Sequence, residues 1–518
     1  PVCEFRLGSS FHSMSKCPVD PQQLRQMLSN MNRFFDLPWT PVYTQSGNPL
    51  DAGPSEALGY WALAGTIAFI VTIYALEGNL DARQRDAYLK TTFPKTMETV
   101  VSEVDEERKK AAAKDNGNTT TKEDHKPILP QLREKFKSAQ AYGLDKINFA
   151  IVSSTYDTLE SVAFLLLGFM PCMWDLSANL GNRFFGWTET DHEVLISLVY
   201  LALTVLVGNL TSLPFEVYST FQIERKHGFN KQTPILFVTD KIKVLILTFV
   251  FGGPFVAFVL HIIKFGGDNF VFYVWVFVLV FSLFTMTIVP SVIMPLFNKY
   301  ELLKDADLKR DIEELADSLK FPLKKLYVVD GSKRSSHSNA FLYGFGGNKR
   351  IVLFDTLLTQ VGHDEIVAIL GHELGHWKLG HMMMNIVVTQ VYSFVALYFF
   401  SLCYTSENLY KAFGFDDADR PIPTIIALML FFQTLWAPVD KVLSFLLTAN
   451  TRRCEFAADK FACDLGKSKK LQSALCKIYL ENLGAMSPDP WYSLYHYSHP
   501  PLVERLTALL KLEKAKQA

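Results

Sequence analysis

Seven long apolar segments constrain the fold of this chain more than any other feature of its sequence. They lie at residues 58–76, 161–174, 194–213, 242–263, 270–289, 382–404 and 423–437. A helix needs about 20 apolar residues to cross the hydrocarbon core of a bilayer, and five of the segments reach that length directly. Seven such segments are difficult to bury inside a soluble protein. The sequence therefore predicts an α-helical multi-pass membrane protein with seven transmembrane helices.

The second and seventh segments are shorter and must be extended to cross a membrane. Extending the second back to residue 151 includes Asp157 and Glu160, and extending the seventh on to residue 447 includes Asp440 and Lys441. Charged side chains at membrane depth are costly unless they face protein or water. We therefore expect these four side chains to point away from lipid.

The composition agrees with a chain that segregates apolar spans from charged loops. Its 518 residues include 51 basic and 52 acidic side chains, which give a net charge of −1. Nucleic-acid-binding proteins usually carry a basic excess, so this balance argues against a nucleic-acid partner. The apolar spans explain the 41 Phe residues and the positive mean hydropathy of +0.13. The seven cysteines form no C-x-x-C pair, which argues against a cysteine zinc cluster or a disulfide framework.

Basic residues in the short loops orient the spans. The loop at 214–241 is richer in basic side chains than the loops on the opposite side of the membrane. Its basic residues include Arg225, Lys226, Lys231 and Lys241. The positive-inside rule places this loop in the cytosol, and parity then places 77–150, 290–381 and 448–518 there too. The N-terminal segment is expected in the lumen.

Five regions follow from these spans. They are a luminal N-terminal segment at 1–57, spans one to five with their loops at 58–289, a cytosolic catalytic region at 290–381, spans six and seven at 382–447, and a cytosolic C-terminal region at 448–518. Residues 1–13 lack an apolar core, so we expect them to be leader residues outside the fold. The polar run at 103–124 is expected to be a helix end that leads into a flexible loop with little that can pack.

The region 290–381 has the pattern of a small unit of helices and strands. The expected elements are a helix at 305–319 and strands at 326–329, 335–343 and 350–354. Gly344, Gly346 and Gly347 separate the last two strands and indicate a hairpin turn. A further helix is expected to begin near His363, because Asp364 and Glu365 suit the first turn of a helix.

That last helix carries the sequence HELGH at 372–376, which matches the pattern H-E-x-x-H. Residues four apart lie on one face of a helix, so His372 and His376 can bind one Zn²⁺. Glu373 can then take a proton from the attacking water. The alternative is a helix with two incidental histidines. His381 is five residues further on, off the ligand face, and is expected to have a structural role.

A catalytic zinc site needs a third protein ligand and one open position. Glu455 and Asp459 are four residues apart and share a helical face, with small alanines between them that allow close packing. Two spans separate them from the H-E-x-x-H motif, so both elements lie on the same side of the membrane. Spacing alone does not settle the third ligand, because such a pair of acids is usually a solvated helix face.

Several ordered motifs together resemble one family. From residue 20 to its C-terminus, the chain is similar to the type I CAAX prenyl proteases, which are integral-membrane zinc endopeptidases of the endoplasmic reticulum. Besides HELGH, the matching motifs are YSTFQIERKHGFNKQT at 218–233, PLFNKY at 295–300, SHSNAF at 336–341, RCEFAAD at 453–459 and YSHPPLVERL at 497–506.

The resemblance implies a role for each matching residue. Glu455 would be the third ligand of a single Zn²⁺, and Asp459 would orient a ligand histidine. Asn339 and Ala340 would lie on an edge strand that binds the substrate backbone. His499 and Arg505 would hold substrate or stabilise the oxyanion; their alternatives are a capping histidine and a surface arginine. The seven helices would form a barrel-like, water-filled chamber above a zincin-like catalytic domain with a small β-sheet.

The resemblance also implies a substrate and a location. The substrate would be a protein that ends in a prenylated C-a-a-X box, from which the last three residues are released. Prenylated proteins and membrane lipid would then be the partners. The location would be the membrane of the endoplasmic reticulum and the nuclear envelope, with the catalytic site and C-terminus in the cytosol. Lys514 and Lys516 resemble a dilysine retrieval signal.

Alternative functions stay open at this point. One is a related membrane zinc protease that degrades misfolded or stalled membrane proteins without prenyl specificity. Another is a transporter or channel in which H-E-x-x-H occurs by chance. A site-two-type intramembrane protease is disfavoured, because its motif lies within a span and its partner acid in a later one, whereas Glu455 is expected after the last span.

Overall fold

The computed structural model of the chain describes residues 54–114, 126–344, 346–415 and 421–517. Among these residues, five helical segments are long and apolar enough to cross a membrane. They are Trp61–Tyr88, Glu193–Glu224, Pro234–Phe265, Gly267–Leu296 and His381–Cys403. Two bent helix pairs raise the number to seven if each pair is one span. The expected N-terminal segment at 1–57, with its leader, lies almost entirely outside the described residues.

The two bent pairs fall on the two segments whose spans were too short in the sequence. Helices α4 (Ile128–Leu166) and α5 (Phe169–Phe185) meet at 65°, and Gly168 between them has a φ of 68°. A left-handed residue ends an α-helix, which explains the break. Helix α15 (Thr424–Leu430) and the π-helical segment η8 (Phe431–Leu435) meet α16 (Ala437–Asp464) at 60°.

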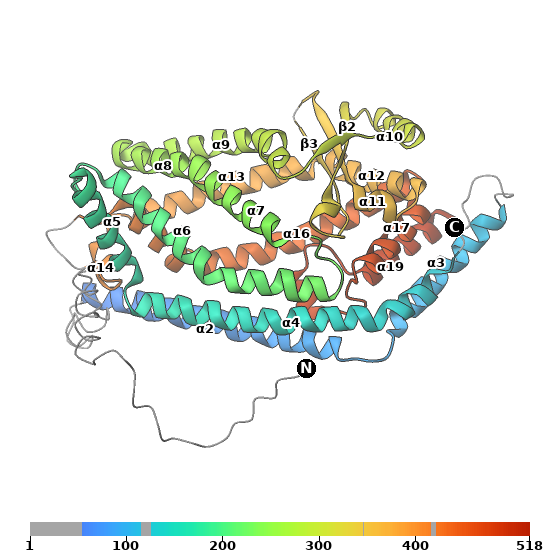
Figure 1. Cartoon of the computed structure of the whole chain (residues 1–518), viewed down its shortest axis with the longest axis horizontal. Helices are drawn as coiled ribbons and strands as arrows, with labels where there is room; N and C mark the ends of the chain where they lie inside the picture. The colour runs from blue at the N-terminus through green and yellow to red at the C-terminus, as the bar shows by residue number, and fades with distance from the viewer. Residues whose placement is uncertain (1–53, 115–125, 345, 416–420, 518) are drawn as a thin grey trace, which may run out of the picture.

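Helices α4 and α16 extend well beyond the expected spans. Helix α16 continues without interruption through the boundary expected at residue 447 and carries Glu455 and Asp459 on its C-terminal extension. In the picture, the long helices α2 (Pro54–Tyr88), α4, α6 (Glu193–Tyr218) and α16 run along the long axis of the molecule (Figure 1). Continuous helix therefore joins the membrane part to the end of the molecule that carries the H-E-x-x-H motif.

The region 77–150, expected to be a loop, is mostly helical. It contains the end of α2, the helix α3 (Lys95–Lys114) and the start of α4. Asp105 is buried in α3 and accepts hydrogen bonds from the backbone N–H groups of Ile128 (2.9 Å) and Leu129 (3.0 Å). Val104 is buried beside it, so the expectation that little of this polar run packs is wrong for its first part. Residues 115–125 of the run lie outside the described residues.

A four-stranded sheet follows the fifth span. Its strands, in the order β1-β2-β4-β3, are β1 (Tyr300–Leu302), β2 (Leu323–Val329), β4 (Lys349–Phe354) and β3 (Ala340–Tyr343). Strands β2 and β4 are parallel, and β3 pairs with β4 in the expected hairpin. Gly344 in the hairpin turn has a φ of 109°, and a Cβ there would lie 2.1 Å from the carbonyl oxygen of Asn348. The expected strand at 335–343 begins only at Ala340.

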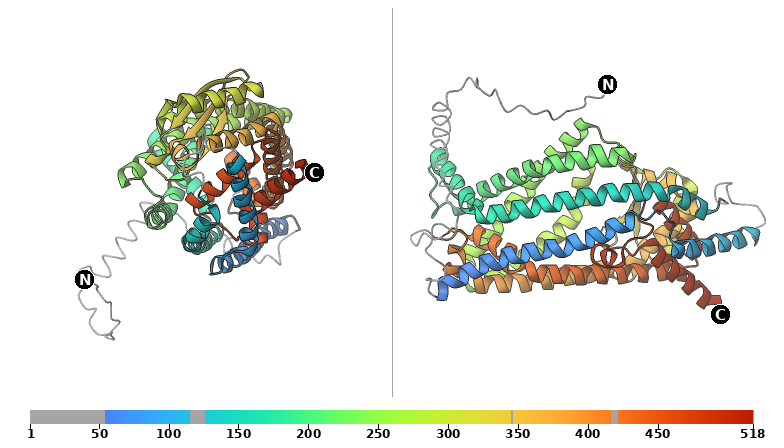
Figure 2. Two further views of the ribbon diagram at one scale, coloured as in Figure 1. Left: turned by 90° about the vertical axis from the view of Figure 1, so that its right-hand side faces the viewer. Right: turned by 90° about the horizontal axis from the view of Figure 1, so that it is seen from below.

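Two large hydrophobic cores and a small cluster of Tyr142, Ile223 and Phe229 organise the described residues. One packs the sheet with helices α3, α10 (Ala306–Ser318), α12 (His363–Lys378), α17 (Ser468–Glu481) and α19 (Leu502–Gln517). The other joins the opposite ends of the long helices around Trp174, Tyr200 and Phe400. The views in Figures 1 and 2 place the sheet and its helices together at one end of the elongated helix bundle.

The charged side chains of the seventh segment contact protein, as expected. The Nζ of Lys441 donates a 2.7 Å hydrogen bond to Glu77 on α2, and Asp440 accepts one of 2.7 Å from the Tyr392 hydroxyl. The Tyr495 hydroxyl also donates to Glu77, at 2.8 Å. These contacts tie α2 to α16 and give the charges polar partners.

Candidate metal centre

Helix α12 presents the H-E-x-x-H motif from inside the catalytic core. Its start is fixed by Glu365, whose side chain reaches back and accepts a 2.7 Å hydrogen bond from the N–H of Gly362, which is one of the two bonds of a capping box. Glu365 is buried and also accepts hydrogen bonds from Ser473 (2.6 Å) and Lys477 (2.8 Å) on α17. The first turn of α12 is thus held by the C-terminal region.

Close packing brings α12 against α16. A Cβ added at Gly375 would lie 3.0 Å from a ring carbon of Phe461, so the absence of a side chain lets the two helices approach. The approach places His372 and His376 of α12 opposite Glu455 of α16. The two alanines that precede Asp459 agree with the close approach expected from the sequence.

The donor atoms of His372, His376 and Glu455 gather at one point, all within 4.8 Å of one another. The two Nε2 atoms are 3.3 Å apart, and Glu455 oxygens lie 3.5 Å from the Nε2 of His372 and 3.2 Å from that of His376. Ligands about 2.0–2.2 Å from a tetrahedral zinc are about 3.4 Å apart, so the three atoms fit three corners of such a site. The fourth corner is left for water or substrate.

The surroundings of Glu455 are a second observation that supports it as a metal ligand. Its side chain is buried, and both of its oxygens face imidazole nitrogens: Oε1 lies 3.2 Å from Nε2 of His376, and Oε2 lies 2.9 Å from Nδ1 of His499. Burying a carboxylate is costly unless positive charge compensates it. The donor set of two imidazoles and a carboxylate is one that catalytic zinc sites use.

The outer nitrogen of each ligand histidine has a partner. The Nδ1 of His372 lies 2.9 Å from Oδ1 of Asp459, and the Nδ1 of His376 lies 2.9 Å from the Nδ1 of His381. Such partners fix the tautomer and the orientation of a metal-binding imidazole. The sequence assigned His381 a structural role and did not pair it with His376. The turn at Gly380, with a φ of 72°, brings it back toward the motif.

Arg505 reaches this cluster from α19 and is buried, with 8% of its surface exposed. Its Nε and Nη2 atoms donate hydrogen bonds of 2.8 and 2.6 Å to the two carboxylate oxygens of Asp459. Its Nη1 lies 3.6 Å from Oε2 of Glu455. The alternative of a surface arginine is therefore wrong, and the bidentate pair favours a role in holding Asp459 in place.

His499 lies in the segment between α18 (Pro490–His496) and α19. Its side chain is 67% exposed, and its Nδ1 is 2.9 Å from Oε2 of Glu455. It is thus at the open side of the cluster, where a substrate would approach. Glu373 follows His372 on α12, and burial raises the pKa of its carboxyl group. A raised pKa suits a carboxylate that must accept and then release a proton.

Asn339 and Ala340 stand at the start of the outer strand of the sheet. Ala340 is the first residue of β3, whereas Asn339 lies just before it. The carbonyl oxygen of Asn339 accepts a 3.0 Å hydrogen bond from the N–H of Phe354. Strand β3 pairs only with β4 among the described strands, so its other edge can accept an added strand.

Two family models divide the chain between them. The model described as CAAX prenyl protease N-terminal, five membrane helices, matches residues 84–299. The model described as Peptidase family M48 matches residues 302–513, which include the H-E-x-x-H motif and Glu455.

Curated relatives match most of the chain. The CAAX prenyl protease 1 homolog of Oryza sativa subsp. japonica is 42% identical over 456 residues, which cover 88% of this chain and 99% of that protein. The homolog of Homo sapiens is 43% identical, with 75% and 89% covered. CAAX prenyl protease 1 of Saccharomyces cerevisiae is 38% identical, with 74% and 87% covered.

A solved structure has the same architecture. The crystal structure of S. mikatae Ste24p superposes with a TM-score of 0.75 at 35% identity, and the match covers 86% of this chain and 99% of that one. The sequence matches and this superposition agree with the ordered motifs and confirm the resemblance drawn from them. The chain therefore belongs to the CAAX prenyl protease family, and its C-terminal part is a metallopeptidase of family M48.

Proposed function

We propose that this protein is a zinc endopeptidase that removes the last three residues of prenylated C-a-a-X proteins. The observation that carries the proposal is the meeting of His372, His376 and Glu455 at distances of 3.2–3.5 Å. The names of the relatives support the substrate class. The peptidase family of the C-terminal part disfavours the transporter or channel alternative.

Three residues would bind the metal, and neighbouring side chains would orient these ligands. His372, His376 and Glu455 are the ligands; Asp459 orients His372 and is itself held by Arg505. Bound zinc would polarise the scissile carbonyl and lower the pKa of water toward neutrality. Arg505 acts as a positioning residue in this scheme, rather than as a group that touches substrate.

Proton transfer would be the task of Glu373. It takes a proton from the attacking water and passes it to the leaving amine. His499, exposed beside Glu455, is available to donate a hydrogen bond to the developing oxyanion. The free edge of β3, beginning at Asn339 and Ala340, would bind the substrate backbone as an added strand.

We place the catalytic end in the cytosol and the protein in the endoplasmic reticulum membrane. The basic residues of the loop at 214–241 support this orientation. Both lysines of the dilysine pattern form ion pairs with the fold. The Nζ of Lys514 lies 2.5 Å from a carboxylate oxygen of Glu103, and the Nζ of Lys516 lies 2.9 Å from one of Asp464. A retrieval receptor would have to compete with these surface ion pairs, which are individually weak.

The test compares a farnesylated C-a-a-X peptide with the same peptide lacking the prenyl group. Purified full-length protein should release the terminal tripeptide from the farnesylated peptide, as seen by mass spectrometry. A chelator should abolish release and added Zn²⁺ should restore it. Equal turnover of both peptides would favour the membrane quality-control protease instead. No release from either peptide, with zinc bound, would refute the proposal.

A further inference from the structure

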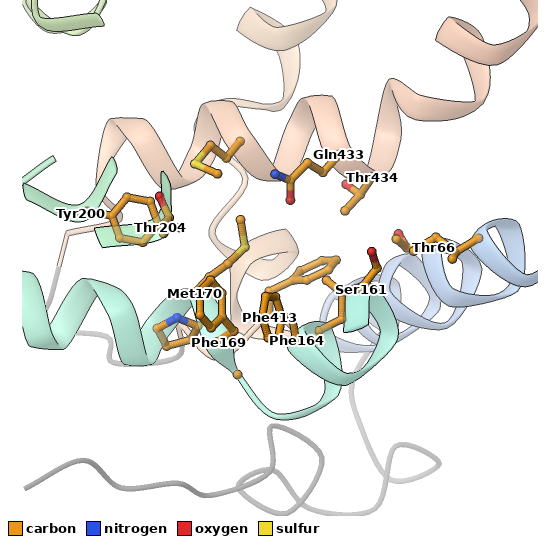
Figure 3. Close-up of a pocket in the computed structure, with 15 residues that line it drawn as sticks. Thr66, Ser161, Phe164, Phe169, Met170, Tyr200, Thr204, Phe413, Gln433 and Thr434 are labelled. Carbon is orange, nitrogen blue, oxygen red and sulfur yellow. The ribbon is translucent and has the colours of Figure 1, made fainter. Parts of the chain in front are cut away.

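A second cavity lies at the end of the helix bundle opposite the metal centre. Its volume is about 430 Å³, and it is lined by residues of α2, α4, α5, α6, α15 and η8 and by Phe413 (Figure 3). Small-molecule sites usually have volumes of about 300–1,000 Å³, so the cavity has the size of a ligand site.

The cavity is separate from the metal centre. Gln433 and Thr434 of its wall come just before α16, whereas Glu455 lies 18 residues beyond Ala437, the first residue of that helix. A rise of about 1.5 Å per residue puts Ala437 and Glu455 about 27 Å apart. A molecule in this cavity would therefore not touch the metal ligands.

Both broken helices of the bundle line this cavity. Gly168 and Met170 at the 65° bend form one wall, and Gln433 and Thr434 of the π-helical segment before the 60° bend form another. A broken helix at membrane depth leaves backbone groups that must be satisfied, and it is tolerated where it lines a cavity or binding site. Because two independent helix breaks line the same cavity, we infer that the cavity has a function.

The cavity is apolar with a few hydroxyl and amide groups. Apolar side chains, chiefly phenylalanine and methionine, form about half of the wall, and none of the 15 lining residues is acidic, basic or histidine. The hydroxyls of Thr66, Thr204 and Thr434 donate to carbonyl oxygens of their own helices, at 2.8, 3.1 and 2.6 Å. They can therefore only accept a hydrogen bond from a ligand.

Tyr200 differs from these threonines. It lines the cavity, is fully buried, and its hydroxyl has no hydrogen-bond partner among the described residues. A buried hydroxyl without a partner costs about 1–3 kcal/mol. Tyr200 thus offers an unused donor and acceptor to whatever fills the cavity.

We propose that this cavity binds a neutral lipid that carries a single hydroxyl group on a hydrocarbon body, drawn from the surrounding bilayer. The hydrocarbon packs against the aromatic and aliphatic wall, and the hydroxyl pairs with Tyr200. The lack of charged side chains excludes the carboxylate of a fatty acid or of a cleaved prenyl-cysteine product. Sterols and isoprenoid alcohols share the chemistry that the cavity selects, and the experiment separates them.

The experiment measures binding to full-length protein in phosphatidylcholine nanodiscs. The probes are tritiated cholesterol and tritiated farnesol, each competed with its unlabelled alcohol or with the parent hydrocarbon that lacks the hydroxyl group. The variants are Tyr200→Phe, which removes only the hydroxyl, and Ser161→Phe, which fills the cavity from α4 with a larger side chain. Tyr273→Phe is the matched control, because Tyr273 lies exposed on α9 (Phe270–Ile288) and does not line the cavity.

We expect at least one alcohol to bind saturably at one site per chain. Tyr200→Phe should weaken its binding roughly three- to tenfold, the effect of one hydrogen bond, and should not change binding of the parent hydrocarbon. Ser161→Phe should weaken both, and Tyr273→Phe neither. Should Tyr200→Phe fail to fold, preference of the native protein for the alcohol over the parent hydrocarbon, lost in Ser161→Phe, carries the same conclusion. Absence of saturable binding by both alcohols, or equal binding to the native protein and both cavity variants, overturns the proposal.

Discussion

Oδ1 of Asp459 lies 2.9 Å from Nδ1 of His372, the ring nitrogen that faces away from Glu455. This contact makes a carboxylate on α16 the support of a histidine on α12, while Glu455 of the same helix faces the other ring nitrogen at 3.5 Å. One helical turn of α16 thereby supplies two side chains: Glu455, which faces the metal centre, and Asp459, which orients His372.

Asp459→Asn should weaken zinc binding about 10–100-fold, because the amide is neutral and holds the Nδ1–H less strongly. Competition with a coloured chelator measures the affinity. Asp464→Asn is the control on the same helix, since Asp464 is exposed and pairs only with Lys516 at the surface. Equal zinc affinity of Asp459→Asn and native protein would contradict the positioning role.

Glu455→Ala should lose zinc and proteolysis together, because it removes one of three ligands. Metal content of the purified protein, measured by mass spectrometry, gives the first readout, and tripeptide release gives the second. A variant that retained one zinc per chain would show that another residue is the third ligand.

Glu373→Gln should separate metal binding from catalysis. The amide cannot accept a proton, so the rate should fall about 10²–10⁴-fold, the usual range for loss of a general base. Zinc content should stay at the native level, because Glu373 is not among the three clustered ligands. Loss of zinc in this variant would mean that Glu373 supports the metal rather than the proton transfer.

Zinc uptake should release protons and weaken as the pH falls. Burial opposes protonation of His372, but its contacts with Asp459 and Glu455 outweigh burial and raise its pKa to about 9. The metal-free imidazole is thus protonated near neutral pH, and zinc must displace that proton. Between about pH 7 and pH 6 the zinc affinity should fall about tenfold for each proton released. Titration calorimetry in buffers of different ionisation enthalpy counts these protons, and a pH-independent affinity would oppose this account.

Asp105→Ala should destabilise the fold by about 1–3 kcal/mol, because it leaves the buried N–H groups at the start of α4 without an acceptor. Thermal unfolding followed by tryptophan fluorescence measures the change. Asp364→Ala is the comparison: its surface pair with Lys470 should contribute about 0–1 kcal/mol. Similar unfolding temperatures for the two variants would show that Asp105 is not a structural cap.

The sequence predicted the parts of the site that follow from local spacing. The H-E-x-x-H motif on a helix and the Glu455–Asp459 spacing depend only on helix geometry, and the structure brings these residues together. The pairing of Arg505 with Asp459 depends on how α19 packs on α16, and the pairing of His381 with His376 depends on the turn at Gly380. Such contacts are tertiary, and spacing carries no signal for them.

The fold was predictable to a similar extent. Long apolar runs predicted the membrane class, and the glycines near residue 345 predicted the hairpin. The helix breaks at Gly168 and before α16 could not be predicted from hydropathy. A hydropathy average over a window is not sensitive to the conformation of a single left-handed residue. The packing of α3 was obscured by charge: its buried side chains, Met97, Val101, Val104 and Asp105, have helical spacing but lie in a strongly charged stretch.

The uninterrupted helix α16 also has a consequence for how the enzyme is made. His372 and His376 are synthesised before the sixth span, and Glu455 emerges only after the seventh. The ligand set is therefore completed only when both of those helices have entered the bilayer and the chain has returned to its starting side. On the proposed ligand set, a half-inserted nascent chain lacks one of the three ligands, so metal binding and protease activity would have to wait until insertion is finished.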